Sequence, residues 1–229
     1  ANALPLNGLN TGEVSALYPN LFVPAGFTFS IWGAIYLLLL LYVFRSSSLL
    51  WRNNNSAHQL LHAQTLAPLF SLTCVLNASW IMAWHYLQLI VSLLIMIGLL
   101  YILIRMYLLM QQHRPALLGL DALMLYVPFV VYLAWICVAT IANTTALLVH
   151  VDWGGWGLAA WVWSCVMIVT AVLLSVWFGL RKGEWAYGLV VAWALWGIYS
   201  RQAVIDERIG YAAVAGILAA LVSAAAGFI

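Results

Sequence analysis

The chain has 229 residues, of which 66% are hydrophobic and 6% are charged, and its mean hydropathy is +1.04. An ordinary globular domain is about 25% charged, so this composition indicates an integral membrane protein. The formal net charge of +2 is small and scattered, which excludes a nucleic-acid-binding protein.

Apolar runs near the roughly 20 residues needed to cross a bilayer lie at residues 27–44, 66–86, 89–109, 118–142, 156–179, 185–203 and 209–229. Inside hydrocarbon every backbone polar group must be paired within its own segment, so these runs are expected to be helices. Continuous apolarity without polar alternation excludes the strands of a barrel. The predicted fold is an all-α integral membrane protein, a bundle of about seven transmembrane helices.

Polar and aromatic side chains share a face on two of these helices. In the second helix, the stretch LNASW spaces Asn77 and Trp80 three residues apart, which puts them on one face. In the fourth, Tyr132 and Trp135 have the same spacing, and Asn143 follows Trp135 by eight residues, within a quarter turn of that face. An amide in a bilayer needs a partner, which either a neighbouring helix or a ligand supplies.

The chain contains 13 tryptophans, 11 tyrosines and 8 phenylalanines. The aromatic belt at the membrane interface is expected to include Trp51, Trp153, Trp156, Trp177 and Trp185. The tryptophans expected deeper in their helices are Trp32, Trp80, Trp135 and Trp163. Such rings either pack the bundle or line a cavity that suits a large planar ligand.

Ionisable residues within the spans are candidate sites because burying them in lipid is costly. Asp121 is expected to lie in the first turn of the fourth helix, at the positive end of its dipole. His85 is expected to be a polar tip in the headgroup layer rather than a haem or metal ligand. His58 and His62 are spaced for one metal ion, but with no third ligand nearby a solvated loop helix is favoured. No metal site is predicted.

A retinal protein and a disulfide-linked framework are both disfavoured. A retinal Schiff base needs a lysine within the membrane, and the single lysine, Lys182, lies in a polar loop. Cys74, Cys137 and Cys165 are widely spaced within predicted spans and are expected to be small hydrophobes rather than disulfides.

Loop charges predict the orientation, because cytoplasmic loops carry the excess of Lys and Arg. With the Ala1 end on the non-cytoplasmic side, the basic residues that fall inside are Arg45, Arg52, Arg105, Arg114, Arg181 and Lys182, and those outside are Arg201 and Arg208. The start at Ala1 leaves two expectations open: a signal or anchor has been removed, or a further helix lies upstream.

Three segments together resemble the translocator protein family, also called tryptophan-rich sensory proteins (TspO/MBR). The opening stretch resembles the family's first loop and second helix, a proline-rich entrance followed by W-G-x-x-Y, through Pro24, Trp32, Gly33 and Tyr36. LNASW resembles the family's L-N-W-A-W, and YLAW with an asparagine eight residues after its tryptophan matches the fifth-helix pattern. The resemblance covers roughly residues 20–148, and the family's first helix has no counterpart in it.

Departures from the family limit what is carried over. Ser30 replaces a typical proline, and Ile81 and Met82 stand where the family has Pro-Pro. After Asn143 the sequence TTALLV lacks the aromatic and basic run linked to sterol binding, so cholesterol recognition by that motif is not expected.

The resemblance implies a membrane receptor or sensor that binds a planar hydrophobic ligand, such as a porphyrin or related tetrapyrrole, in a pocket closed by the first loop. The implied ligand-binding residues are Phe27, Phe29, Trp32, Tyr36, Asn77, Trp80, Tyr132, Trp135 and Asn143. Pro24 and Gly26 would admit a non-helical lid, with Phe27, Phe29 and Trp32 on its underside. Alternatively, proline and glycine only end a loop, and the aromatics belong to the belt.

The resemblance also implies the organisation of the chain. The expected parts are an N-terminal extramembrane lid at 1–26, a TspO-like core of four helices at 27–148 and three additional C-terminal helices at 149–229. No cofactor is obligatory, porphyrin or haem being a ligand, and a bacterial inner membrane is the expected location. Partners are the lipid bilayer and the small molecule, with a homodimer or larger membrane complex open.

Other functions remain open in the sequence. The extra helices suit an accessory subunit of a larger complex, and Ala215, Ala219 and Ser223 form a small-residue face for close helix contact. A transporter is less favoured because no internal repeat is found. No set of catalytic side chains is assembled, so enzyme activity stays open only as photochemistry of a bound porphyrin with tryptophans as electron donors.

Overall fold

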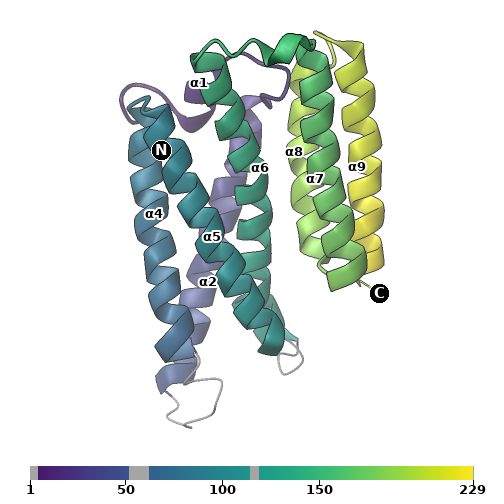
Figure 1. The fold of residues 1–229 in the computed structure, drawn as a ribbon. Helices are drawn as coiled ribbons and strands as arrows, with labels where there is room; N and C mark the ends of the chain where they lie inside the picture. Colours follow the sequence, from purple (N-terminus) through teal and green to yellow (C-terminus); the bar gives the residue numbers. More distant parts are fainter. Residues whose placement is uncertain (1–4, 52–61, 114–118, 229) are drawn as a thin grey trace.

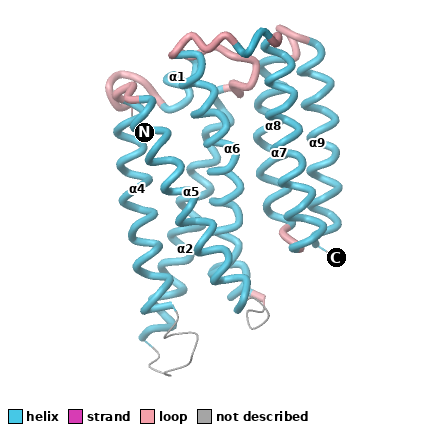
Figure 2. The backbone as a smooth tube through the Cα atoms, viewed as in Figure 1, coloured by secondary structure: helices cyan, strands magenta, loops and turns pink. Residues whose placement is uncertain are grey.

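A computed structural model describes residues 5–51, 62–113 and 119–228 and shows these to be a bundle of long helices (Figure 1). Within these residues the backbone is helix and loop (Figure 2). The predicted all-α membrane fold is therefore confirmed. The physical reason is that each long apolar run satisfies its own backbone hydrogen bonds only as a helix.

Seven long helices follow one another along the described residues. They are α2 (Ile31–Trp51), α4 (Ala67–His85), α5 (Leu89–His113), α6 (Val127–His150), α7 (Ala160–Lys182), α8 (Trp185–Gln202) and α9 (Glu207–Phe228). Single 3-10 turns precede two of them, η1 (Gly26–Ser30) before α2 and η5 (Gly155–Gly157) before α7. Single π-helical turns precede two others, η2 (His62–Leu66) before α4 and η4 (Ala122–Tyr126) before α6.

Six helices in the described residues are long and apolar enough to cross a membrane. They span Gly26–Ser48, Gln64–His85, Leu89–Gln112, Ala122–His150, Ala160–Lys182 and Glu207–Phe228. The predicted helix at 185–203 forms as α8 but is not among the six, because its tryptophans, tyrosines and glycines and its terminal Arg201 and Gln202 lower its mean hydropathy. It lies beside them and packs against α6, α7 and α9, so neighbouring helices rather than lipid cover much of its surface.

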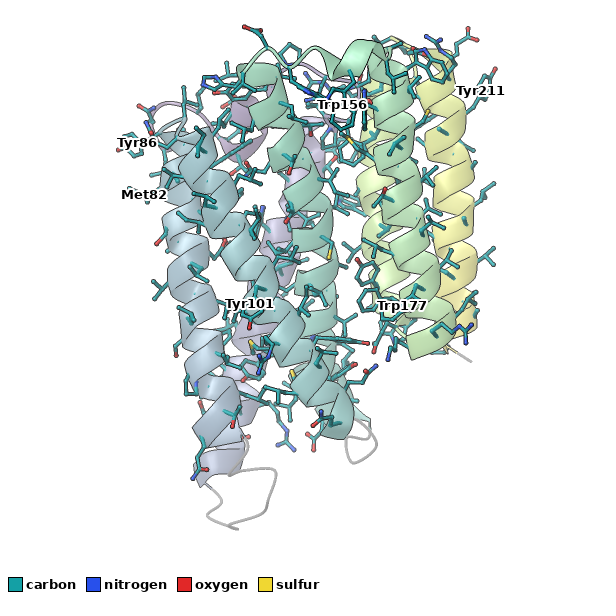
Figure 3. All side chains as sticks on the ribbon, in the orientation of Figure 1. Met82, Tyr86, Tyr101, Trp156, Trp177 and Tyr211 are labelled. Carbon is teal, nitrogen blue, oxygen red and sulfur yellow. The ribbon has the colours of Figure 1, made fainter. Side chains whose placement is uncertain are left out.

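The outer surface of the bundle is apolar. Large side chains such as Leu94, Leu173 and Val222 are exposed, which suits contact with lipid rather than water. Trp156 and Trp177, labelled in Figure 3, lie near opposite ends of the bundle, and both are exposed. These positions agree with the predicted aromatic belt.

Helix α6 continues to His150, past the predicted end at residue 142. The polar residues that suggest an end are accommodated inside the helix, because Thr144 and Thr145 donate to carbonyls one turn earlier at 2.8 and 2.9 Å. The predicted boundary between core and extension at residue 148 thus falls in the last turn of α6. The division into core and extension stays a prediction.

An N-terminal segment, residues 5–25, crosses one end of the bundle and is called the lid below (Figure 1). It contains a short helix, α1 (Thr11–Ala16), which the sequence analysis missed. Asn10 and Glu13 form a reciprocal capping box that makes this short helix possible. The lid is therefore partly helical rather than wholly irregular.

Hydrogen bonds hold the lid on two sides. On one side, the indole of Trp84 donates to the carbonyl of Thr11 at 3.3 Å, and Asn7 donates to the carbonyl of His85 at 3.1 Å. On the other, the amide of Gln202, at the end of α8, donates to the carbonyls of two lid residues at 3.1 and 2.7 Å. The lid therefore joins the ends of α4 and α8.

Small residues on α9 bring the last three helices close together. Ser223 is buried, and its hydroxyl lies 2.9 Å from that of Ser175 on α7. Ala215 is exposed, so the predicted face is rotated from the face in contact, which includes Gly216 and Ala220. The contact face serves packing within the chain.

Replacing Gly188 of α8 by alanine is expected to lower the free energy of unfolding by about 1–3 kcal/mol. The added Cβ would lie 2.6 Å from the carbonyl oxygen of Ala220 and 2.9 Å from the Cβ of Ala224. Gly98→Ala in α5 is the matched control, because open space surrounds its Cβ and alanine favours the helix by about 1 kcal/mol. Thermal unfolding followed by circular dichroism compares the two; an equal or higher midpoint for Gly188→Ala would contradict the close α8–α9 contact.

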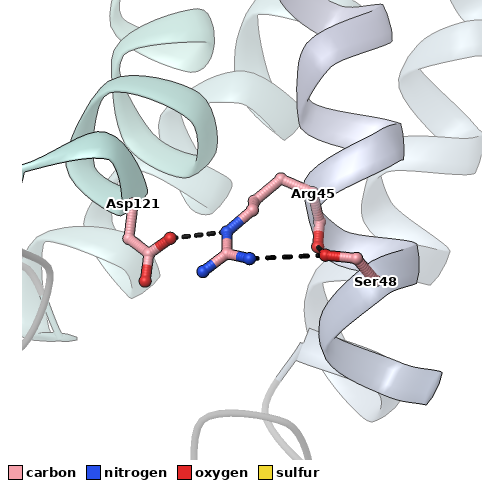
Figure 4. A network of polar contacts seen from close by, with 3 residues as sticks. All are labelled: Arg45, Ser48 and Asp121. Carbon is pink, nitrogen blue, oxygen red and sulfur yellow. Dashed lines mark hydrogen bonds and ion pairs between the residues drawn. The ribbon is translucent and has the colours of Figure 1, made fainter. Parts of the chain in front are cut away.

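Asp121 forms an ion pair at the end of the bundle opposite the lid. Its carboxylate accepts from Nε of Arg45 in α2 at 2.6 Å, and a second guanidinium nitrogen contacts Ser48 (Figure 4). Asp121 directly precedes η4 but caps it with no side-chain hydrogen bond. The carboxylate thus joins two helices, a role that its place in the sequence did not indicate.

Candidate functional site

A closed cavity of about 30 Å³ lies beneath the lid. Its walls come from the lid, η1, α2, α4, α6 and α8. Aromatic side chains form a large part of the lining: Phe22, Phe29, Trp32, Trp80, Trp84 and Trp135. The cavity is therefore an aromatic chamber at the lid end of the bundle.

Trp32, in the first turn of α2, is the centre of the aromatic cluster. Its ring stacks on that of Trp80 with centroids 5.5 Å apart, and Trp80 stacks on Trp84 at 6.0 Å. Trp135 meets Trp32 edge to face at 6.4 Å. Offset-stacked and edge-to-face pairs are favourable ring geometries, so the cluster is well packed.

Three polar atoms of cavity-lining residues have no hydrogen-bond partner among the described residues. They are the indole Nε1 of Trp80, the indole Nε1 of Trp135 and the amide Oδ1 of Asn143. The other end of the Asn143 amide is engaged, since Nδ2 donates to the hydroxyl of Ser92 at 2.7 Å. Each buried unpaired group costs about 1–3 kcal/mol. A molecule in the cavity that offers acceptors and a donor would recover this free energy.

The structure brings five of the nine predicted site residues to the cavity wall. These five are Phe29, Trp32, Trp80, Trp135 and Asn143. They come from three separate parts of the chain: η1 with the start of α2, α4, and α6. Trp80 of α4 lines the cavity with Trp135 and Asn143 of α6, whereas Asn77 and Tyr132, expected on the same faces, do not.

Three predicted residues lie behind this wall. Asn77 donates to the hydroxyl of Tyr36 at 3.0 Å, joining α4 to α2, and the Tyr36 side chain is 42% exposed on the bundle surface. Tyr132 is buried and meets Trp32 edge to face at 6.0 Å. These residues position Trp32 and do not line the cavity. For Asn77, a neighbouring helix supplies the amide's partner.

Phe27 does not line the cavity. Its ring lies against Trp193 and Trp196 of α8, with centroids 5.6 and 5.4 Å apart, and it is 43% exposed. The 3-10 turn at Gly26–Ser30 explains the difference, because it turns Phe27 toward α8 while Phe29 faces inward. Of the predicted underside, Phe29 and Trp32 line the cavity, and Phe22 and Pro24 of the lid join them there.

Several lining residues were not expected from the sequence. Trp84 follows Trp80 by four residues, so helical spacing would have placed it on the same face. Ala194 and Ile198 of α8 carry no chemical signal and come from the predicted C-terminal extension. One wall of the cavity is therefore formed by α8, a helix that lies outside the three sequence motifs.

No group of three metal-ligating side chains occurs in the part of the chain that the structure describes. His85 is buried rather than interfacial, and its Nδ1 lies 2.9 Å from the carbonyl oxygen of Ile81. His58 and the side chain of His62 lie outside the described residues. The cysteines are free, and Cys74 is exposed on the outer surface.

Comparison with known proteins finds one family whose model matches nearly the whole chain. A family model described as TSPO-like protein matches residues 1–226. The match therefore includes the lid, the cavity and helices α7 to α9. No curated protein and no solved structure was found to match the chain.

Proposed function

The chain belongs to the TSPO-like protein family, and from this membership and the aromatic cavity we propose that it is a membrane receptor for a planar hydrophobic ligand of the tetrapyrrole class. One observation carries the proposal. Five residues chosen from sequence motifs meet at one closed cavity, where the polar atoms of Trp80, Trp135 and Asn143 lack partners.

The cavity is too small to hold a tetrapyrrole in the described conformation. Pockets for small molecules have volumes of about 300–1,000 Å³, and this cavity has about 30 Å³. The described conformation is thus a closed form, and a planar ligand needs the aromatic wall or the lid to move. The lid covers the cavity, and its opening would break hydrogen bonds to α4 and α8 and expose buried side chains such as Val14 and Phe22.

The orientation is part of the proposal. Arg45 and Asp121 lie at the end opposite the lid, and α7 ends there with Arg181 and Lys182. An excess of basic residues marks the cytoplasmic side. The lid and the cavity would then face the non-cytoplasmic side, from which the ligand would bind.

Replacing Trp80 and Trp135 together by phenylalanine is expected to weaken protoporphyrin IX binding by at least tenfold, because two indole donors and much of the stacking surface are lost. The measurement is a titration of the purified protein in detergent, following both tryptophan quenching and the porphyrin absorbance. Haem is titrated in parallel.

The matched control is Trp156→Phe with Trp177→Phe, which removes two exposed tryptophans that do not line the cavity. Saturable one-to-one binding in the parent and the control, lost in a folded Trp80/Trp135 variant, would support the receptor. Linear, unsaturable quenching in all three proteins would contradict it and indicate partitioning into detergent.

A further inference from the structure

An open groove of about 470 Å³ lies on the surface beside the closed cavity. It runs between α1 of the lid, η1 and the last turn of α8. Gly12 and Glu13 contribute from the lid, Phe27 and Phe29 from η1, and Arg201 from α8. The groove falls within the range of small-molecule pockets, whereas the cavity does not.

Phe29 is the residue that the groove and the cavity share. Its ring meets Trp135 edge to face at 6.2 Å on the cavity side. On the lid side, a Cβ added to Gly12 would lie 3.1 Å from the ring. A single half-buried aromatic side chain therefore lies between the open groove and the aromatic chamber.

The groove contains a cation with free donor capacity. Arg201 has no hydrogen-bond or ion-pair partner for its side chain within residues 5–51, 62–113 and 119–228. The neighbouring Glu13 carboxylate is engaged, because it accepts from the backbone N–H of Asn10 at 2.7 Å. Arg208, at the same end of the bundle, is by contrast paired with Asp206 at 2.7 Å.

A guanidinium binds a carboxylate through two parallel hydrogen bonds, which makes it selective for that planar anion. Arg201 also lies in the last turn of α8, where a positive charge favours the helix dipole, but that role leaves its five N–H donors unused. The adjacent residue, Gln202, fastens the lid. A carboxylate at Arg201 would thus sit at the edge of the lid.

We propose that the groove is the outer part of the ligand site, in which Arg201 binds a carboxylate at the ligand's edge while the planar body lies toward the aromatic chamber past Phe29. This inference rests on the proposed function. The ligand class is then narrower than hydrophobic molecules in general. It is a flat apolar ring system that carries an acidic side group.

The test compares protoporphyrin IX, which carries two carboxylates, with its uncharged dimethyl ester. Both are titrated into the parent, Arg201→Gln and the matched control Arg208→Gln. Arg201→Gln is expected to weaken binding of the free acid about tenfold and to leave binding of the ester unchanged. Comparing proteins for one ligand at a time removes differences in detergent partitioning between acid and ester.

Each outcome separates this inference from the proposed function. If Arg201→Gln weakens acid and ester equally, or changes neither, Arg201 does not recognise the carboxylate and the inference fails. Binding of both ligands that still depends on Trp80 and Trp135 would then leave the receptor intact. A parent that binds neither ligand would overturn the receptor and the groove together.

Phe29→Ala tests by kinetics whether the ligand passes Phe29 between the groove and the cavity. Removing the ring between groove and cavity is expected to raise the association and dissociation rates of protoporphyrin IX several-fold, as followed by stopped-flow quenching. Unchanged rates would show that the ligand does not pass Phe29 and would contradict that part of the inference.

Discussion

Glu184→Ala is expected to lower the free energy of unfolding by about 3 kcal/mol, since hydrogen bonds to a charged group each contribute about 1.5–3 kcal/mol. Glu184 is 3% exposed and lies in the turn between α7 and α8. Its carboxylate accepts from the hydroxyls of Tyr107 on α5, at 3.0 Å, and of Tyr126 in η4. One side chain thus joins the C-terminal helices to the rest of the bundle.

Two controls isolate this role. Glu184→Gln keeps an acceptor oxygen at the same place and is expected to lose less stability than alanine. Glu207→Ala removes an exposed carboxylate from the first turn of α9 and is expected to change stability by less than about 0.5 kcal/mol. Thermal unfolding in detergent, followed by circular dichroism, ranks the three variants. A Glu184→Ala protein as stable as Glu207→Ala would show that this network does not hold the two groups of helices together.

Gly197→Ala is expected to loosen the lid and to lower the free energy of unfolding by about 1–3 kcal/mol. The carbonyl of Gly197 accepts from the backbone N–H of Ala25 at 2.9 Å, so α8 and the end of the lid are in direct backbone contact. A Cβ at this position would lie 1.9 Å from Oγ1 of Thr28 and 2.9 Å from its Cβ. Rotation of the threonine relieves the first overlap but not the second, so η1 must move away from α8.

Limited proteolysis measures this effect directly, because a displaced lid exposes residues 5–25 to cleavage. Thr28→Ala in the Gly197→Ala background is expected to restore part of the protection, since it removes Oγ1 and Cγ2. Gly33→Ala in α2, where open space surrounds the added Cβ, is the control. Equal protection of the parent and Gly197→Ala against proteolysis would contradict close packing of the lid against α8.

The lid, the cavity and α8 form one arrangement that the family match also covers as a whole. Ala194 and Ile198 of α8 complete the cavity wall, and Gln202 at its end fastens the lid. Helix α8 therefore contributes to the candidate site as well as to the fold. This explains how a helix with modest hydropathy has a defined place in a membrane bundle.

The sequence by itself determined the class of fold and part of the site. Long apolar runs can satisfy their backbone groups in lipid only as helices, so composition and run length were sufficient to predict the bundle. Helical spacing is a local property, and of the residues that it grouped, Trp80, Trp135 and Asn143 line the cavity whereas Asn77 and Tyr132 do not. The motifs also identified the family.

Only the tertiary structure decided which distant residues meet. The rotation of each helix and the path of the lid follow from contacts across the bundle, which leave no local pattern in the sequence. For that reason Phe27 was expected at the cavity yet lies on α8, while Ala194 was overlooked yet lines the wall. The network at Glu184, the ion pair of Arg45 with Asp121 and the groove shared by Arg201 and Phe29 likewise depend on segments that meet only after folding.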